Sequence, residues 1–220
     1  MIAFLHTSPV HVDTFALLMQ VYAPDCGVRH LVDESLLRDA QVHGVEDDVL
    51  IARVTHRMNE AWASDAKVVV CTCSTIGGIA ERVDGRGRFL PMRIDCAMAD
   101  EAVDCGSQIL IVAALESTVR PTQQLVENSA AVRGRSVSIR TMVVQSAWPH
   151  FQSGDLLAYT FAIEQAIEQA IRDQAGDADV VVLAQASMAS VAKRFDGVGI
   201  RVLSSPELGV RKAIEAAQIR

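Results

Sequence analysis

Two short stretches of the sequence place small polar side chains directly after an apolar run, where they could do chemistry. In VVVCTCSTIGG, from Val68 to Gly78, three valines lead into two cysteines, three hydroxyl side chains and a glycine pair. In VVVLAQASMAS, a similar run leads into a glutamine and small residues, about 113 residues further on when counted from Val68 to Val181. This repeat predicts two similar structural units, each with a polar turn after a buried strand.

Cys73 is the first residue of these turns that could react. It lies where the predicted strand ends, before a helix that we expect to start near Thr75. Free N–H groups and the helix dipole lower the pKa of a thiol at such a place, and a thiolate is both a nucleophile and a base for a carbon acid. The alternative is a small packing residue, because free cysteines are often buried. Cys71 lies within the apolar strand, and we interpret it as core packing.

Hydroxyl side chains accompany the thiol. Ser74 and Thr75 could hold a carboxylate or stabilise an enolate-like oxyanion together with the backbone N–H groups of their turn. Helix capping is the alternative, and both roles are compatible. Ser187 in the second turn has the same two interpretations. Ser8 and Thr118 follow other predicted strands and are candidates of the same kind, with turn formation as their alternative.

The elements that must position these residues alternate along the chain. Short β-branched runs predict strands over Ile2–Thr7, Val28–Asp33, Lys67–Thr72, Ile109–Leu115, Val137–Val144, Asp179–Gln185 and Ile200–Ser205. Apolar residues at helical spacing predict helices over Val10–Tyr22, Asp47–Ala63, Thr118–Ala131, Leu156–Ala175 and Glu207–Ile219.

This alternation predicts an α/β protein made of two pseudosymmetric lobes. Each lobe is expected to be a short, mostly parallel sheet flanked by helices, because its strands are apolar throughout. Ligands of open α/β sheets bind beyond the carboxyl ends of the strands. The turns that hold Cys73 and Gln185 should therefore border an active cleft between the lobes, together with the residues that follow the strands ending near His6 and Leu115.

Composition excludes several classes of function. The 220 residues carry a net charge of −7 without a basic cluster, so we expect no nucleic-acid partner. No apolar stretch approaches the roughly 20 residues that span a bilayer, and the first residues do not read as a signal peptide, so we expect a cytoplasmic protein without membrane contact. Five cysteines, an odd number, argue against a disulfide framework, and the histidine and cysteine spacings predict no metal site.

The two turns resemble those of the aspartate/glutamate racemase superfamily, which includes hydantoin racemases, maleate isomerases and arylmalonate decarboxylases. VVVCTCSTIGG is similar to that family's strand followed by a C-N-T-A turn, and VVVLAQASMAS to its second strand and G-C-T/A turn. RVLSSPELGV is similar to a common C-terminal segment. The resemblance covers nearly the whole chain. It implies a first lobe of residues 1–95 completed by helix 206–220, and a second lobe of residues 96–205.

The resemblance also implies site residues. Family members use neither metal nor organic cofactor and hold a small carboxylate between two cysteines, one from each lobe. Cys73 matches the first cysteine, but Gln185 stands where the second is expected. A glutamine amide is neither an acid nor a base near neutral pH, although it can donate and accept hydrogen bonds. The matching substrate-binding positions are Ser8 and Pro9 in the first-strand loop, Ser74 and Thr75 in the first turn, Thr118 in the loop facing it, and Ala186 and Ser187 in the second turn.

We therefore expect a cofactor-independent isomerase or racemase-like enzyme that acts on a small carboxylate through the thiol of Cys73. Because a second thiol is missing, an arylmalonate-decarboxylase-like lyase and a non-catalytic carboxylate-binding protein stay open as alternatives. A homodimer is expected from the family resemblance and from the general frequency of two-fold dimers.

Overall fold

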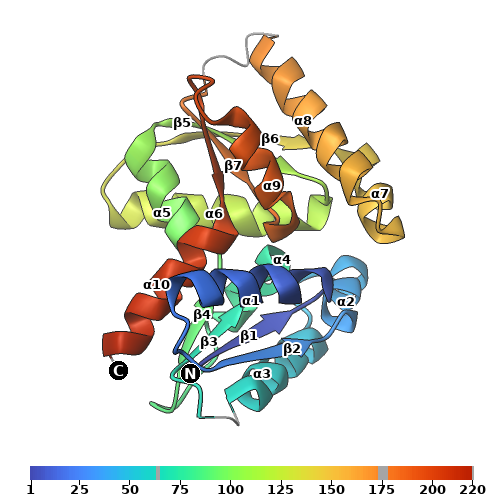
Figure 1. Cartoon of the computed structure of the whole chain (residues 1–220). Helices are drawn as coiled ribbons and strands as arrows, with labels where there is room; N and C mark the ends of the chain where they lie inside the picture. Colours follow the sequence, from blue (N-terminus) through green and yellow to red (C-terminus); the bar gives the residue numbers. More distant parts are fainter. Residues whose placement is uncertain (63–64, 173–177, 220) are drawn as a thin grey trace. The chain divides into compact units, whose positions relative to one another are not determined.

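The computed structural model describes residues 1–62, 65–172 and 178–219. Its contacts divide the chain into two compact units, which we call unit 1 (residues 1–97 and 206–220) and unit 2 (residues 98–205). Each unit contains a four-stranded sheet, and all strand pairs in both sheets are parallel. The predicted α/β class with parallel sheets flanked by helices is confirmed (Figure 1).

Unit 1 has the strand order β2-β1-β3-β4. Its strands are β1 (Ile2–His6), β2 (Val28–Val32), β3 (Val68–Cys71) and β4 (Leu90–Arg93). Its helices are α1 (Val10–Tyr22), α2 (Ser35–His43), α3 (Asp48–Trp62), α4 (Ser74–Ala80) and α10 (Ser205–Ile219), and α5 (Cys96–Cys105) begins at its end and continues into unit 2.

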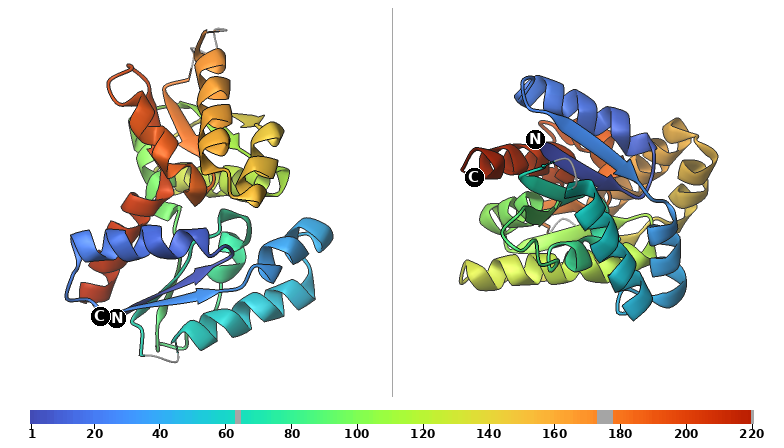
Figure 2. Two further views of the ribbon diagram at one scale, coloured as in Figure 1. Left: turned by 45° about the vertical axis from the view of Figure 1, so that its right-hand side comes forward. Right: turned by 90° about the horizontal axis from the view of Figure 1, so that it is seen from below.

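The central strands of unit 1 are buried on both faces, which explains their continuous apolar sequences. Ala3 and Leu5 of β1 face the core formed with α2, α3 and α4. The alternate residues Phe4 and His6 face α1, where both rings lie against Phe15. Figure 1 shows α1 and α3 on opposite faces of this sheet, and Figure 2 shows the same arrangement from two further sides.

Unit 2 repeats this topology with the strand order β6-β5-β7-β8. Its strands are β5 (Gln108–Ala113), β6 (Ser138–Val143), β7 (Val180–Leu183) and β8 (Arg201–Ser204). Its helical segments are α6 (Glu116–Val132), η1 (Gln145–Ala147), α7 (Trp148–Ser153), α8 (Leu156–Arg172), η3 (Ala186–Met188), α9 (Ala189–Ala192) and η4 (Lys193–Phe195).

The strand registers define how many residues separate equivalent positions in the two units. Val68 begins the pairing of β3 with β1, and Val180 begins the pairing of β7 with β5. The equivalent residues are therefore 112 positions apart rather than 113, which makes Val180 and not Val181 the counterpart of Val68. With this offset, Cys73 corresponds to Gln185, and Thr75 to Ser187.

Most predicted elements are present with ends that differ by one or two residues. The predicted ends of two helices, at Ala63 and Ala175, lie outside the described residues. Among the described residues, β4, α2, α5, α7 and the short α9 are regular elements that were not predicted. Within the described part of the chain, no helix is both long enough and apolar enough to cross a membrane.

A close approach of α10 to the end of β4 generates the first prediction. A Cβ atom at Gly209 would lie 2.1 Å from the carbonyl oxygen of Ile94 and 2.5 Å from its Cδ1 atom. We expect Gly209→Ala to lower the free energy of unfolding by about 3 kcal/mol, because backbone cannot move aside as a flexible side chain can. Gly27→Ala is the control, since its Cβ would meet only Met1 at an ordinary 3.4 Å. Chemical denaturation measures both, and equal stabilities of the two variants would contradict the packing argument.

Candidate active site

Cys73 lies at the carboxyl edge of the unit 1 sheet. It is the second residue after β3 and the N-cap of α4, with extended backbone angles of φ −102° and ψ 113°. Its side chain is partly exposed and packs against the apolar core under α3 and α4. Cys73 is therefore held by packing without being fully buried, and reactive cysteines sit in such partly exposed places.

Cys71 has a different environment. It is fully buried within the same core, and its thiol donates a hydrogen bond of 3.6 Å to the carbonyl oxygen of Cys73. Burial raises the pKa of the Cys71 thiol strongly, and the neighbouring Cys73 thiol raises it further. Cys71 is therefore a neutral packing residue, as predicted from its place in the strand.

A buried ion pair contacts and supports the first turn of α4. Arg93 donates to both carboxylate oxygens of Asp95, at 2.7 and 3.0 Å, and to the carbonyl oxygen of Ser74 at 3.4 Å. Burial opposes ionisation of Asp95, but the Arg93 charge and its hydrogen bonds outweigh this and lower the pKa of the carboxyl. Gly77 allows the helix to approach, because a Cβ there would lie 3.0 Å from Arg93 Nε.

The predicted hydroxyl residues of unit 1 lie at this same edge. Ser74 and Thr75 are buried in the first turn of α4, which has no side-chain cap hydrogen bond. Ser8 is partly buried and Pro9 is exposed, in the turn between β1 and α1. The backbone N–H of Thr72 donates to the carbonyl oxygen of Leu5, so the two loops start from strands that are paired up to their ends.

Gln185 occupies the equivalent position in unit 2. It is the second residue after β7 and the N-cap of η3, with φ −111° and ψ 140°. Its Oε1 atom accepts a hydrogen bond of 2.9 Å from the backbone N–H of Ala114, and its Nε2 atom donates to Thr118 Oγ1 at 3.4 Å. The amide thereby ties the end of β7 to the turn between β5 and α6.

The other predicted residues of unit 2 surround this amide. Thr118 is buried in the first turn of α6, and its carbonyl oxygen accepts a hydrogen bond from Thr122. Ala186 is buried and Ser187 is partly exposed. The Ser187 hydroxyl lies 2.7 Å from the hydroxyl of Tyr159, a buried residue of α8. Burial raises the pKa of Tyr159, which keeps its phenol protonated near neutral pH.

Three residues at the two edges were not singled out as site partners from the sequence. No sequence pattern indicates Tyr159 or Arg93, because each contacts its turn from a distant part of the chain: Tyr159 at Ser187 and Arg93 at Ser74. His6 was visible as a histidine at the end of a strand, but its partner was not. Its ring is fully buried, and its Nδ1 atom lies 2.8 Å from Thr72 Oγ1. Among the described residues, no group of three or more His, Cys, Asp or Glu side chains is placed to hold a metal ion.

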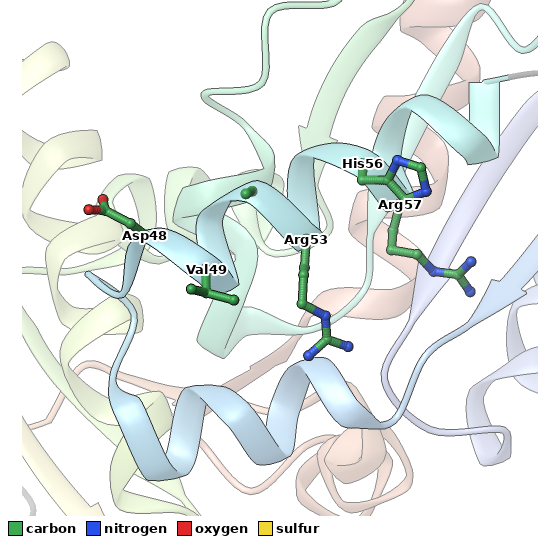
Figure 3. A pocket seen from close by; sticks show the side chains of 6 residues that line it. Asp48, Val49, Arg53, His56 and Arg57 are labelled. Carbon is green, nitrogen blue, oxygen red and sulfur yellow. The ribbon is translucent and has the colours of Figure 1, made fainter.

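Two surface hollows are lined by neither Cys73 nor Gln185. One, of about 430 Å³, follows α3 and is lined by Asp48, Val49, Ala52, Arg53, His56 and Arg57 (Figure 3). Arg53 pairs with Asp39, and Arg57 pairs with Asp33, so these guanidinium charges are already compensated. The other hollow, of about 380 Å³, lies on α6 and includes Glu116. Neither adjoins a reactive side chain of the predicted site.

Comparison with known proteins places the fold. No model of a protein family matches the sequence, and no curated protein is similar to it in sequence.

Solved structures are similar in three dimensions. An allantoin racemase from Pseudomonas fluorescens shares 20% identity at a TM-score of 0.60, over 99% of this chain and 91% of that one. An aspartate racemase from Picrophilus torridus shares 13% at 0.68, over 99% and 94%. A glutamate racemase from Bacillus anthracis shares 15% at 0.70, over 100% and 82%. The fold is thus that of the racemases.

The buried histidine of unit 1 generates a prediction about stability and pH. Desolvation by burial, with smaller effects of His30 and His11, lowers the pKa of His6 from 6.5 to about 3. The unfolded chain therefore binds this proton before the folded chain does as the pH falls. The stabilisation is complete above about pH 6.5 and is lost progressively toward pH 3, with a slope of about 1.4 kcal/mol per pH unit for this group.

Denaturant unfolding of wild type, His6→Asn and His56→Asn between pH 6 and pH 4.5 measures this slope. The exposed His56 serves as the control. We expect His6→Asn to flatten the dependence of the unfolding free energy on pH, and His56→Asn to leave it unchanged. Parallel curves for wild type and His6→Asn would show that His6 ionises normally in the folded protein.

Proposed function

We propose that this protein is a cofactor-independent, racemase-like isomerase of a small carboxylate, with Cys73 as its thiolate base or nucleophile. The observation that carries the proposal is the position of Cys73. Cys73 is partly exposed at the carboxyl edge of a parallel sheet, where open α/β proteins bind their ligands, in a fold shared with racemases of amino acids and of allantoin.

In this proposal the first turn of α4 binds the substrate carboxylate. Ser74 and Thr75 supply backbone N–H groups and hydroxyls, and the Arg93–Asp95 pair holds that turn in place. Ser8 and Pro9 border the substrate from the β1–α1 turn. In unit 2, the proposal assigns substrate binding to the Gln185 amide, to Thr118 and to the turn of Ala186 and Ser187.

The chemistry is a proton transfer at carbon. The Cys73 thiolate takes the α-proton, so that an S–H bond forms while the electron pair of the C–H bond moves into the carboxylate. The resulting ene-diolate is stabilised by hydrogen-bond donors at the turn. The Cys73 thiol then returns a proton to the carbon. If the thiol exchanges its proton with solvent before returning it, the α-hydrogen is replaced by a solvent hydrogen. If it does not, the same proton returns and no change can be measured.

The glutamine makes this chemistry one-sided. Gln185 holds the position equivalent to Cys73, and its amide cannot deliver a proton. Unit 2 contains one cysteine, Cys105, which ends α5 just before β5 begins and so belongs to the opposite edge of that sheet. Protonation from a single face therefore gives exchange with retention of configuration. Isomerisation by Cys73 alone would instead use the thiolate as a nucleophile: its sulfur adds to a cis double bond conjugated with the carboxylate, the resulting carbon–carbon single bond rotates, and the C–S bond breaks as the double bond re-forms in the trans arrangement. Protonation from a single face also supports a second candidate, a decarboxylase that protonates its product on one face.

Isotope exchange tests the role of the thiol. Amino acids, hydroxy acids and substituted malonates are incubated with the protein in D₂O, and deuterium at the α-carbon is followed by NMR. We expect exchange or decarboxylation with at least one of them, and a loss of about 10²- to 10⁴-fold in Cys73→Ala, the range that general acid–base groups contribute. Cys105→Ser, which alters an exposed thiol elsewhere, should keep full activity. Activity that survives in Cys73→Ala would refute the proposal.

Restoring a second thiol tests the role assigned to Gln185. We expect Gln185→Cys to convert one-sided exchange into racemisation, because it adds a second acid–base group at the position equivalent to Cys73. Chiral chromatography of the product measures the inverted enantiomer. Gln185→Ser is the matched control, since it also removes the hydrogen bonds to Ala114 and Thr118 but adds no thiol. Equal product mixtures from both variants would contradict the assignment.

A further inference from the structure

A chain of hydrogen bonds crosses the α1 face of the unit 1 sheet and ends beside Cys73. His6 Nδ1 lies 2.8 Å from Thr72 Oγ1, and His6 Nε2 lies 2.9 Å from His30 Nδ1. Thr72 and His6 are buried, while His30 on β2 is partly exposed. The chain therefore runs from a partly exposed imidazole, through a fully buried one, to the residue that separates Cys71 from Cys73.

The donors and acceptors of this chain follow from its buried end. The Thr72 hydroxyl donates its hydrogen to the carbonyl oxygen of Leu5 at 3.2 Å. It can therefore only accept from His6, which must carry its proton on Nδ1. His6 Nε2 is then an acceptor and receives the Nδ1 proton of His30. Each of these hydrogen bonds thus has a fixed donor and a fixed acceptor. Of the ring nitrogens of His6 and His30, only Nε2 of His30 takes no part in these hydrogen bonds.

The surroundings favour this neutral arrangement. The rings of His6 and His30 stack on each other and on Phe4, with centroids 5.1 to 6.0 Å apart. The titratable groups that face them are His11 and Asp13, both on α1. Burial lowers the pKa of His6 to about 3 and that of His11 to about 4, so both stay uncharged at neutral pH.

The hydrogen-bond chain joins the two loops that carry the unit 1 residues of the proposed site. His6 ends β1 and precedes Ser8 by two residues, and Thr72 follows β3 and precedes Cys73 by one. Beyond the last pair of the β1–β3 ladder, Leu5 with Cys71, the Thr72 hydroxyl links the two strand ends through two hydrogen bonds, one from His6 and one to the carbonyl oxygen of Leu5. Loss of the hydroxyl would leave the backbone hydrogen bond from Thr72 to Leu5 and would loosen the peptide that sets the direction of the Cys73 side chain.

We propose that His6 and Thr72 are positioning residues that fix the peptide before Cys73 and thereby aim its thiol at the substrate. His30 completes the arrangement by holding His6 in the tautomer that donates to Thr72. This inference rests on the proposed function, because it concerns the same thiol. Neither residue touches the substrate, so both act through the backbone next to Cys73.

Thr72→Val tests the inference, since valine keeps the shape of threonine but can neither accept from His6 nor donate to the carbonyl oxygen of Leu5. We expect kcat for α-hydrogen exchange to fall by 10-fold or more while KM changes by less than about 3-fold, because small misplacement of a reacting group costs rate rather than binding. Thr72→Ser, which keeps the hydroxyl, should recover kcat to within about 3-fold of wild type. Val210→Ala is the control for lost stability, because Val210 is fully buried on α10 and belongs neither to the hydrogen-bond chain nor to the core against which Cys73 packs.

A second readout keeps the test independent of turnover. The rate of Cys73 alkylation by iodoacetamide, followed by mass spectrometry, should change by at least about 3-fold in Thr72→Val and not in Thr72→Ser or Val210→Ala. If wild type exchanges no carboxylate, the proposed function fails while this measurement still judges the positioning role. Alkylation and kcat of Thr72→Val that match wild type, or that change no more than in Val210→Ala, would overturn the inference.

Discussion

The register of the central parallel strand decides where the chemistry of each unit lies. β3 is paired on both sides, with β1 and β4, and β7 is paired in the same way with β5 and β8. Because paired parallel strands end at one edge, the loops that follow them gather there. Cys73 and Gln185 are each the second residue after such a strand, in extended backbone that leads into a helical turn. A shift of register would move them from that edge.

Each unit secures this edge with a side chain that reaches a neighbouring strand. In unit 1 the link is the His6–Thr72 hydrogen bond, and a buried arginine supports the turn that follows Cys73. In unit 2 the link is Gln185 itself, through Ala114 and Thr118. The same position therefore holds a free thiol in one unit and an engaged amide in the other. This asymmetry is the physical reason for proposing one-sided proton transfer on a fold that is otherwise repeated.

The sequence predicts the parts of this arrangement that depend on local pattern. Buried strands such as VVVC and VVVL are apolar throughout, and each is followed by small polar residues, so both turns and their equivalence are visible. Strand β4 cannot be predicted from such a pattern, because it is a half-buried edge strand that contains Pro91 and ends in Arg93. Partners far apart in the chain, such as Tyr159 and Ser187 or His6 and Thr72, are set by the packing of distant elements and leave no local pattern.

The central claim is that the thiol of Cys73 acts on a small carboxylate bound at the first turn of α4, and a crystal structure of the protein with bound malonate tests it most directly. We predict one malonate carboxylate on the first turn of α4, with the sulfur of Cys73 facing the central carbon of the malonate. Malonate bound at a place that Cys73 does not reach, or a Cys73 sulfur closed off from the ligand, would contradict the account.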